Sequence, residues 1–124
     1  MDRFQKYIGR LLLPLLLSPL LAVPVWAHAF PTRSDPKVGS EVGEAPTSIK
    51  IWFDGDLEPA FSGMRLFDSE GREVDHGGAG VDEKDPALLT LPVSKIGPGK
   101  YRVQWEAVAK DGHRTEGDFT FKIK

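Results

Sequence analysis

Two residues that can bind a metal ion lie two positions apart near the end of the chain, Asp111 and His113. They follow a stretch, 101–109, in which apolar and polar residues alternate as in a β-strand. Side chains at i and i+2 of a strand point to the same face, so the carboxylate and the imidazole could converge on one point. The same residues also fit a polar β-turn, because Asp-Gly is a common hairpin pair, and in that case the histidine is simply solvated.

The first 27 residues have the composition of an export signal. Basic residues precede position 11, residues 11–25 are apolar and rich in leucine, and small residues flank Trp26 where signal peptidase would cut, after Ala27. A membrane anchor fits less well, because the apolar run is shorter than the roughly 20 residues of a spanning helix and holds prolines. We predict a signal peptide at 1–27 and a mature domain at 28–124. A second possible cut, after Ala29, would start the mature chain at Phe30.

Cutting after Ala27 would make His28 the first residue, with a free α-amine and an imidazole on one amino acid. The amine and Nδ1 can close a six-membered chelate ring around a metal ion. Both groups must lose their protons to bind, which is feasible near neutrality given ordinary pKa values of about 7.7–8.0 and 6.5. Nitrogens from His28 and His113 with an oxygen from Asp111 favour Cu(II), which prefers tetragonal nitrogen and oxygen ligands. Zinc is the rival metal.

Composition narrows the class of protein. The leader carries three basic and one acidic residue, so its removal changes the net charge from −2 to −4. The sequence has no cluster of basic residues of the kind that binds nucleic acid. The 97 residues of 28–124 make one small domain, and the absence of cysteine excludes thiol chemistry, iron–sulfur clusters and Cys-zinc sites.

The pattern of the mature chain predicts strands and almost no helix. Alternating apolar residues mark strands at 49–53, 101–109 and 119–123, with further strands at 28–33, 61–67, 72–74 and 88–93. Gly63 is predicted to mark a bulge, and segments 37–46 and 75–86 to be loops. About seven short strands at turn spacing indicate an all-β antiparallel sandwich or barrel.

Several motifs together make the chain resemble a known family, the CopC family of periplasmic copper-resistance proteins. The resemblance covers 28–124, and its most specific part is the run from Gly99 to His113, GKYRVQWEAVAKDGH. The resemblance is also carried by a leader that ends immediately before His28. Further matches are Ser34-Asp35-Pro36, Val42, Ala45 and Pro46, residues 51–54, Gly71, Gly117, Phe119 and Phe121.

The resemblance implies an immunoglobulin-like Greek-key β-sandwich or barrel and a periplasmic copper-binding role without enzymatic activity. One Cu(II) per chain would bind the amine and imidazole of His28, the imidazole of His113 and, more weakly, Asp111. The protein would buffer copper or hand it to a separate inner-membrane transporter of the CopD type. Some relatives carry a Met-rich loop for Cu(I), whereas Met64 is the one methionine of 28–124, so we predict a Cu(II)-only protein. Ala109-Lys110 also replaces a serine that relatives often have before Asp-Gly-His.

Two other functions stay open on the sequence. An N-terminal histidine with a second histidine also resembles the histidine brace of copper-dependent oxidases, and a metal-free immunoglobulin-like adhesion module would need neither. Four further features rank lower: His76 as a metal ligand, the acidic stretch 82–85 as a calcium loop, and Trp52 and Trp105 as platforms for substrate. We expect His76 and the acidic stretch to be solvated, and both tryptophans to pack within strands.

Overall fold

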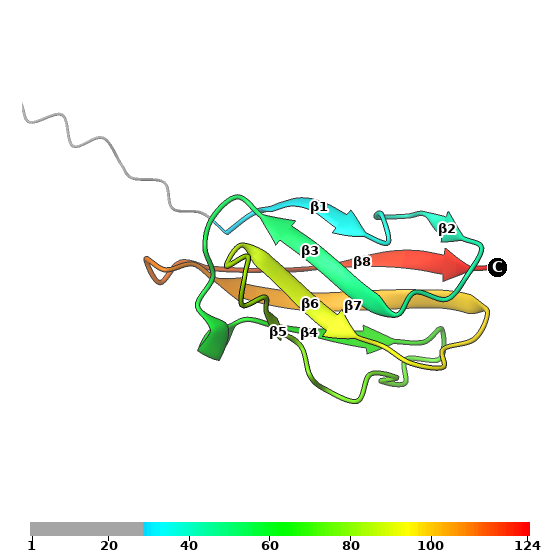
Figure 1. Ribbon diagram of the computed structural model, residues 1–124. Helices are drawn as coiled ribbons and strands as arrows, with labels where there is room; N and C mark the ends of the chain where they lie inside the picture. Colours follow the sequence, from blue (N-terminus) through cyan, green and yellow to red (C-terminus); the bar gives the residue numbers. More distant parts are fainter. Residues whose placement is uncertain (1–28) are drawn as a thin grey trace, which may run out of the picture.

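The computed structural model describes residues 29–124, which form two packed β-sheets (Figure 1). The predicted signal peptide and His28 lie outside these residues. Within the described part there is no α-helix, and no helix is long and apolar enough to cross a membrane. The elements are β1 (Pro31–Asp35), β2 (Glu41–Val42), β3 (Ser48–Phe53), the short 3-10 helix η1 (Pro59–Phe61), β4 (Gly63–Phe67), β5 (Gly80–Val81), β6 (Leu88–Pro92), β7 (Gly99–Val108) and β8 (Arg114–Ile123).

The two sheets have the strand orders β1-β3-β6-β5 and β2-β8-β7-β4. Neighbouring strands run antiparallel, except that β2 runs parallel to β8. The chain passes between the sheets several times, so strands that follow one another in sequence are often in different layers, as in β-sandwiches. The predicted all-β sandwich is confirmed, and so is the near-absence of helix among the described residues.

The core lies between the sheets and follows the alternation read from the sequence. In β7 the side chains of Tyr101, Val103, Trp105 and Ala107 are buried while the residues between them are more exposed. Phe53 of β3 meets Trp105 edge to face, with ring centroids 5.4 Å apart, and this contact joins the two layers. Each such large apolar side chain contributes roughly 1.5–3 kcal/mol by leaving water.

The β7–β8 hairpin is the longest paired element and carries the candidate ligands at its end. Its ladder is continuous from Gly99 opposite Ile123 to Val108 opposite Arg114. Segment 54–61 packs beside that end: Leu57 forms a bridge with Ala109, and Glu58 N donates a 2.7 Å hydrogen bond to Val108 O. The hairpin end is therefore supported on one side by the chain that leaves β3.

Local predictions were wrong at several places. The first strand was predicted at 28–33 and is Pro31–Asp35, and the last was predicted at 119–123 and is Arg114–Ile123. Two-residue strands, β2 and β5, lie inside the segments predicted to be loops, since they are too short to show alternation. The predicted strand at 72–74 is a single bridge, because the Asp75 carboxylate accepts from Leu66 N where a further strand residue could have paired. Gly63 is in regular register with β7, and the irregularity in pairing occurs in β1 instead, between Pro31 and Arg33.

Candidate metal centre

Asp111 and His113 lie in the loop that closes the β7–β8 hairpin. Ala109 N donates to His113 O at 2.9 Å, and Gly112 N donates to Ala109 O at 2.9 Å, so the loop is a compact turn. Gly112 has a φ of 89°, a conformation that favours glycine at this position. The two side chains do converge, but they do so through the turn and not, as the alternation argument assumed, on one face of a strand.

The Asp111 carboxylate makes two contacts with His113. One oxygen, Oδ1, accepts from the backbone N of His113 at 3.0 Å, and Oδ2 lies 2.7 Å from the ring nitrogen Nδ1. The His113 side chain is 65% exposed and that of Asp111 30% exposed. An oxygen donor and a nitrogen donor therefore lie side by side at a position that solvent can reach.

The cationic side chains on either side of the pair are engaged by carboxylates. Lys110 Nζ lies 3.5 Å from Glu58 Oε1, and Arg114 Nη2 lies 2.5 Å from Glu106 Oε2. Pairing reduces the repulsion that these charges would exert on a cation at the loop. The surroundings of Asp111 and His113 are thus compatible with a divalent ion.

The first described residues lie at the base of the same hairpin. Ala29 is completely buried, and its carbonyl accepts a 2.5 Å hydrogen bond from Thr115 Oγ1. Thr115 follows His113 by two residues. In Figure 1 the beginning of β1 and the end of the β7–β8 hairpin lie at the same end of the sandwich.

Asp54, just after β3, fixes the next residue of the chain. Phe30 N donates to Asp54 Oδ1, and Asp54 N donates to Phe30 O, both at 2.9 Å. Sequence reasoning gave no role to Thr115, or to Asp54 beyond its place in the family motif at 51–54. A threonine in a strand and an aspartate after one are ordinary, and Thr115 is 86 residues from its partner. Only the fold brings them to the start of the domain.

Residues 29–124 supply two of the predicted donors but no complete metal site. Among these residues there is no group of three or more His, Cys, Asp or Glu that could hold a metal ion. Asp111 Oδ2 and His113 Nδ1 lie 2.7 Å apart, within hydrogen-bonding distance of each other, and a carboxylate oxygen and an imidazole nitrogen are both donor types that divalent transition-metal ions accept. Further donors have to come from elsewhere, and the predicted source, His28, is outside the described residues.

His76 lies in another region of the molecule. Its side chain is exposed, and the neighbouring Asp75 is used locally, with Oδ1 accepting from Leu66 N and Oδ2 from Gly77 N. Leu66 is opposite Val103 in β7, well before the hairpin loop.

The acidic stretch 82–85 is a turn held by its own carboxylates. Asp82 Oδ2 accepts from the backbone N of Lys84 and of Asp85, at 3.0 and 2.9 Å. Asp85 Oδ1 accepts from Ala87 N at 3.1 Å. These bonds account for the acidic residues as turn-forming groups, as expected for a solvated loop.

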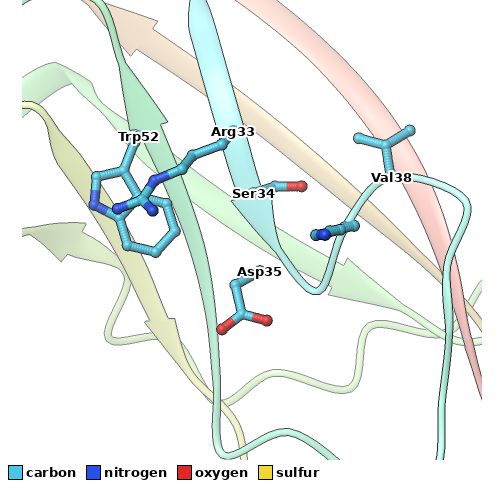
Figure 2. Close-up of a pocket in the computed structure, with 6 residues that line it drawn as sticks. Arg33, Ser34, Asp35, Val38 and Trp52 are labelled. Carbon is cyan, nitrogen blue, oxygen red and sulfur yellow. The ribbon is translucent and has the colours of Figure 1, made fainter.

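The tryptophans pack as predicted. Trp105 is only 9% exposed. Trp52, on the outer face of β3, lies under the Arg33 guanidinium, 3.9 Å from its ring centroid, in a surface pocket (Figure 2). That pocket is lined by Arg33, Ser34, Asp35, Lys37, Val38 and Trp52. It lies towards the Asp35 end of β1, whereas Phe30 precedes the other end, which is the end near the hairpin loop.

Comparison with known families identifies one domain. The CopC domain matches residues 31–124, nearly all of the described chain. Among curated proteins, the chain is 34% identical over 116 residues to Protein YobA of Escherichia coli (strain K12), covering 93% of this chain and 94% of that protein. It is 33% identical over 111 residues to Copper resistance protein C of Pseudomonas syringae pv. tomato, covering 85% and 87%.

A longer relative is matched in part. The chain is 31% identical over 110 residues to Copper transport protein CutJ of Bacillus subtilis (strain 168), covering 88% of this chain but 20% of that protein. Solved structures agree with the fold. CopC from Methylosinus trichosporium OB3b superposes with a TM-score of 0.73 at 32% identity, over 78% of this chain and 94% of that one. PcoC, a methionine-rich copper resistance protein from Escherichia coli, gives 0.66 at 31% identity, over 79% and 100%.

Proposed function

The chain belongs to the CopC family, and from that premise we propose that it binds one Cu(II) ion outside the cytoplasm in copper resistance and homeostasis. The observation that carries the proposal is the meeting of two separate segments at one end of the sandwich. Asp111 and His113 converge in the hairpin loop, and Ala29 is hydrogen-bonded to Thr115 at the base of that hairpin. The names of two relatives, copper resistance protein C and copper transport protein CutJ, point to the same metal.

The proposed ligands are the amine and Nδ1 of His28, the imidazole of His113 and an oxygen of Asp111. Three nitrogens and one oxygen suit Cu(II) better than the other divalent ions of the first transition series. Consecutive Cα atoms are 3.8 Å apart. His28 is therefore separated by a single peptide bond from Ala29, whose carbonyl is hydrogen-bonded to Thr115. This short tether supports His28 as the source of the missing donors.

Burial of Ala29 supports a mature chain that begins at His28. A chain that began at Phe30 would lack a fully buried residue and the hydrogen bond from Thr115. A signal peptide at 1–27, with export to the periplasm, leaves both in place. The proposal therefore ties cleavage after Ala27 to the completed metal site.

The donors that are accessible support Cu(II) as the oxidation state of the bound copper. Cu(I) is selected by soft thioether or thiolate ligands. The chain has no cysteine, and Met64 is 4% exposed in the core. We therefore propose Cu(II) as the species bound, with His113 exposed enough to exchange it. The ion is cargo, buffered or passed to a separate inner-membrane transporter of the CopD type, and we assign no catalytic step to it.

The test uses three proteins with defined first residues: 28–124, 27–124 and 30–124. Each is titrated with Cu(II) against a competing chelator and examined by electron paramagnetic resonance. We expect one tight equivalent with a type 2 spectrum for 28–124. Retaining Ala27 turns the amine of His28 into an amide, which removes a ligand. The 27–124 protein should therefore bind Cu(II) more than about 100-fold more weakly than 28–124, a larger loss than the 10–100-fold usual for an outer-shell group. Loss in 30–124 should be at least as large.

Two outcomes would contradict the proposal. Equal affinities of 28–124 and 27–124 would exclude the amine as a ligand, and weak, non-stoichiometric uptake by 28–124 would exclude a copper site. Hydrogen-peroxide production from ascorbate by the copper-loaded 28–124 protein, at rates well above free copper, would indicate an oxidase in place of a carrier.

A further inference from the structure

The two residues that follow His28 are held by three hydrogen bonds before β1 begins. Thr115 Oγ1 donates to Ala29 O at 2.5 Å. Phe30 N donates to the Asp54 carboxylate and Asp54 N donates to Phe30 O, both at 2.9 Å. Sheet pairing of β1 with β3 starts only at Pro31. These bonds therefore fix a segment that strand pairing alone would leave loose.

The Thr115 bond differs from an ordinary strand contact in what it joins. Its donor lies in β8, two residues after His113, and its acceptor belongs to Ala29, one residue after His28. The bond thus links the chain segments of both histidines directly. The Ala29 methyl group adds a second restraint, because the residue is completely buried.

We propose that Thr115 is a positioning residue for the copper site, assisted by Asp54, because together they hold the start of the mature chain where His28 can meet His113 and Asp111. This inference rests on the proposed function. Ligands held in place before the metal arrives do not have to be ordered when it binds, and outer-shell groups of this kind commonly contribute 10–100-fold to metal affinity.

A purely structural role predicts a different result. A buried carbonyl that loses its donor destabilises the fold, by roughly 1–3 kcal/mol, but this loss alone leaves the geometry of bound copper unchanged in the folded protein. The positioning role predicts a change in the bound copper itself. Affinity and the resonance spectrum, measured on folded protein, separate the two roles.

The test compares variants of the 28–124 protein. Thr115→Val replaces the hydroxyl by a methyl group of similar size, whereas Thr115→Ser keeps the donor. The matched control is Thr90→Val in β6. It too removes a threonine hydroxyl that faces a backbone carbonyl, because Thr90 Oγ1 lies 3.5 Å from Gly80 O. Urea unfolding establishes that each variant is folded under the titration conditions.

We expect Thr115→Val to lower Cu(II) affinity by about 10–100-fold and to give a spectrum with altered or mixed copper parameters. Thr115→Ser should restore both, and Thr90→Val should match the unsubstituted protein. Asp54→Ala, which removes the acceptor for Phe30 N, should shift affinity in the same direction as Thr115→Val. In the metal-free protein, the amide hydrogen of Phe30 should exchange with solvent faster in Thr115→Val and in Asp54→Ala than in the unsubstituted protein.

The inference is overturned if Thr115→Val binds Cu(II) with the affinity and spectrum of the unsubstituted protein, whatever its stability. It is also overturned if Thr115→Ser fails to restore binding. Failure of the proposed function has a separate signature, because then the unsubstituted 28–124 protein itself takes up no stoichiometric copper.

Discussion

His113 Nδ1 lies 2.7 Å from Asp111 Oδ2, while the backbone amide of the same histidine donates to Asp111 Oδ1. A single carboxylate thus contacts both the ring and the main chain of the histidine, which orients the imidazole. An ion that binds both side chains takes the place of the proton between them. If the ion binds the imidazole alone, the carboxylate acts as the outer-shell group that orients the ring. In the first arrangement we propose Asp111 as the weaker ligand, and in the second it acts only by orienting His113.

That relationship predicts unequal effects of two substitutions. His113→Ala removes a nitrogen ligand, and Cu(II) affinity should fall by more than about 100-fold. Asp111→Asn keeps the shape and one oxygen but lowers its basicity, so the fall should be about 10–100-fold. Competition titration of the 28–124 variants measures both. The proposed ranking is wrong if Asp111→Asn is the more damaging change, or if His113→Ala binds like the unsubstituted protein.

His76 provides the matched histidine control. It is exposed and follows Asp75, whose carboxylate is committed to Leu66 N and Gly77 N, away from the hairpin loop. His76→Ala should therefore leave the stoichiometry and affinity for Cu(II) unchanged in the same titration. A loss comparable to that of His113→Ala would mean that His76 reaches the ion, and the proposed ligand set would have to include it.

The core position of Met64 leads to a prediction about Cu(I). Met64 is 4% exposed and lies opposite Trp105 in the β4–β7 pairing. Met64→Leu nearly conserves volume and should cost less than about 1.5 kcal/mol of stability. Anaerobic competition for Cu(I) should give the same weak binding for the variant and the unsubstituted 28–124 protein. Tight Cu(I) binding that disappears in Met64→Leu would contradict a Cu(II)-only site.

The sequence predicted those strands whose burial alternates over many residues. β3 and β7 follow the pattern of apolar residues read from the chain, with Ile49, Ile51 and Phe53 inward in β3. β2 and β5 could not be predicted in this way, because each has two residues and depends on backbone pairing with a distant strand. Short strands depend on tertiary contacts that local patterning does not encode.

The candidate site was predictable in part for a similar reason. Asp111 and His113 are close in sequence, so their meeting needed only a local turn. Thr115 and Ala29 meet across 86 residues, and no local pattern predicts that contact. The role of His28 remains a prediction from cleavage and family resemblance.

Gly117 gives the sharpest prediction about stability in the strand that carries Thr115. It pairs with Trp105 across the hairpin, and a Cβ at this position would lie 2.7 Å from Trp105 Cζ2. The indole is also packed against Phe53, so moving it disturbs the core. We expect Gly117→Ala to destabilise the metal-free 28–124 protein by about 1–3 kcal/mol in urea unfolding, as overpacking does.

The matched control is Gly63→Ala, in β4, where an added Cβ meets nothing within 4 Å. Relief of glycine's entropy cost should make that variant neutral or more stable by about 0.5–1 kcal/mol. Equal stability of the two variants would mean that Trp105 can shift without loss, and that its contact with Phe53 does not fix the spacing of the sheets. A selective loss in Gly117→Ala identifies the glycine as the feature that lets the indole lie against β8.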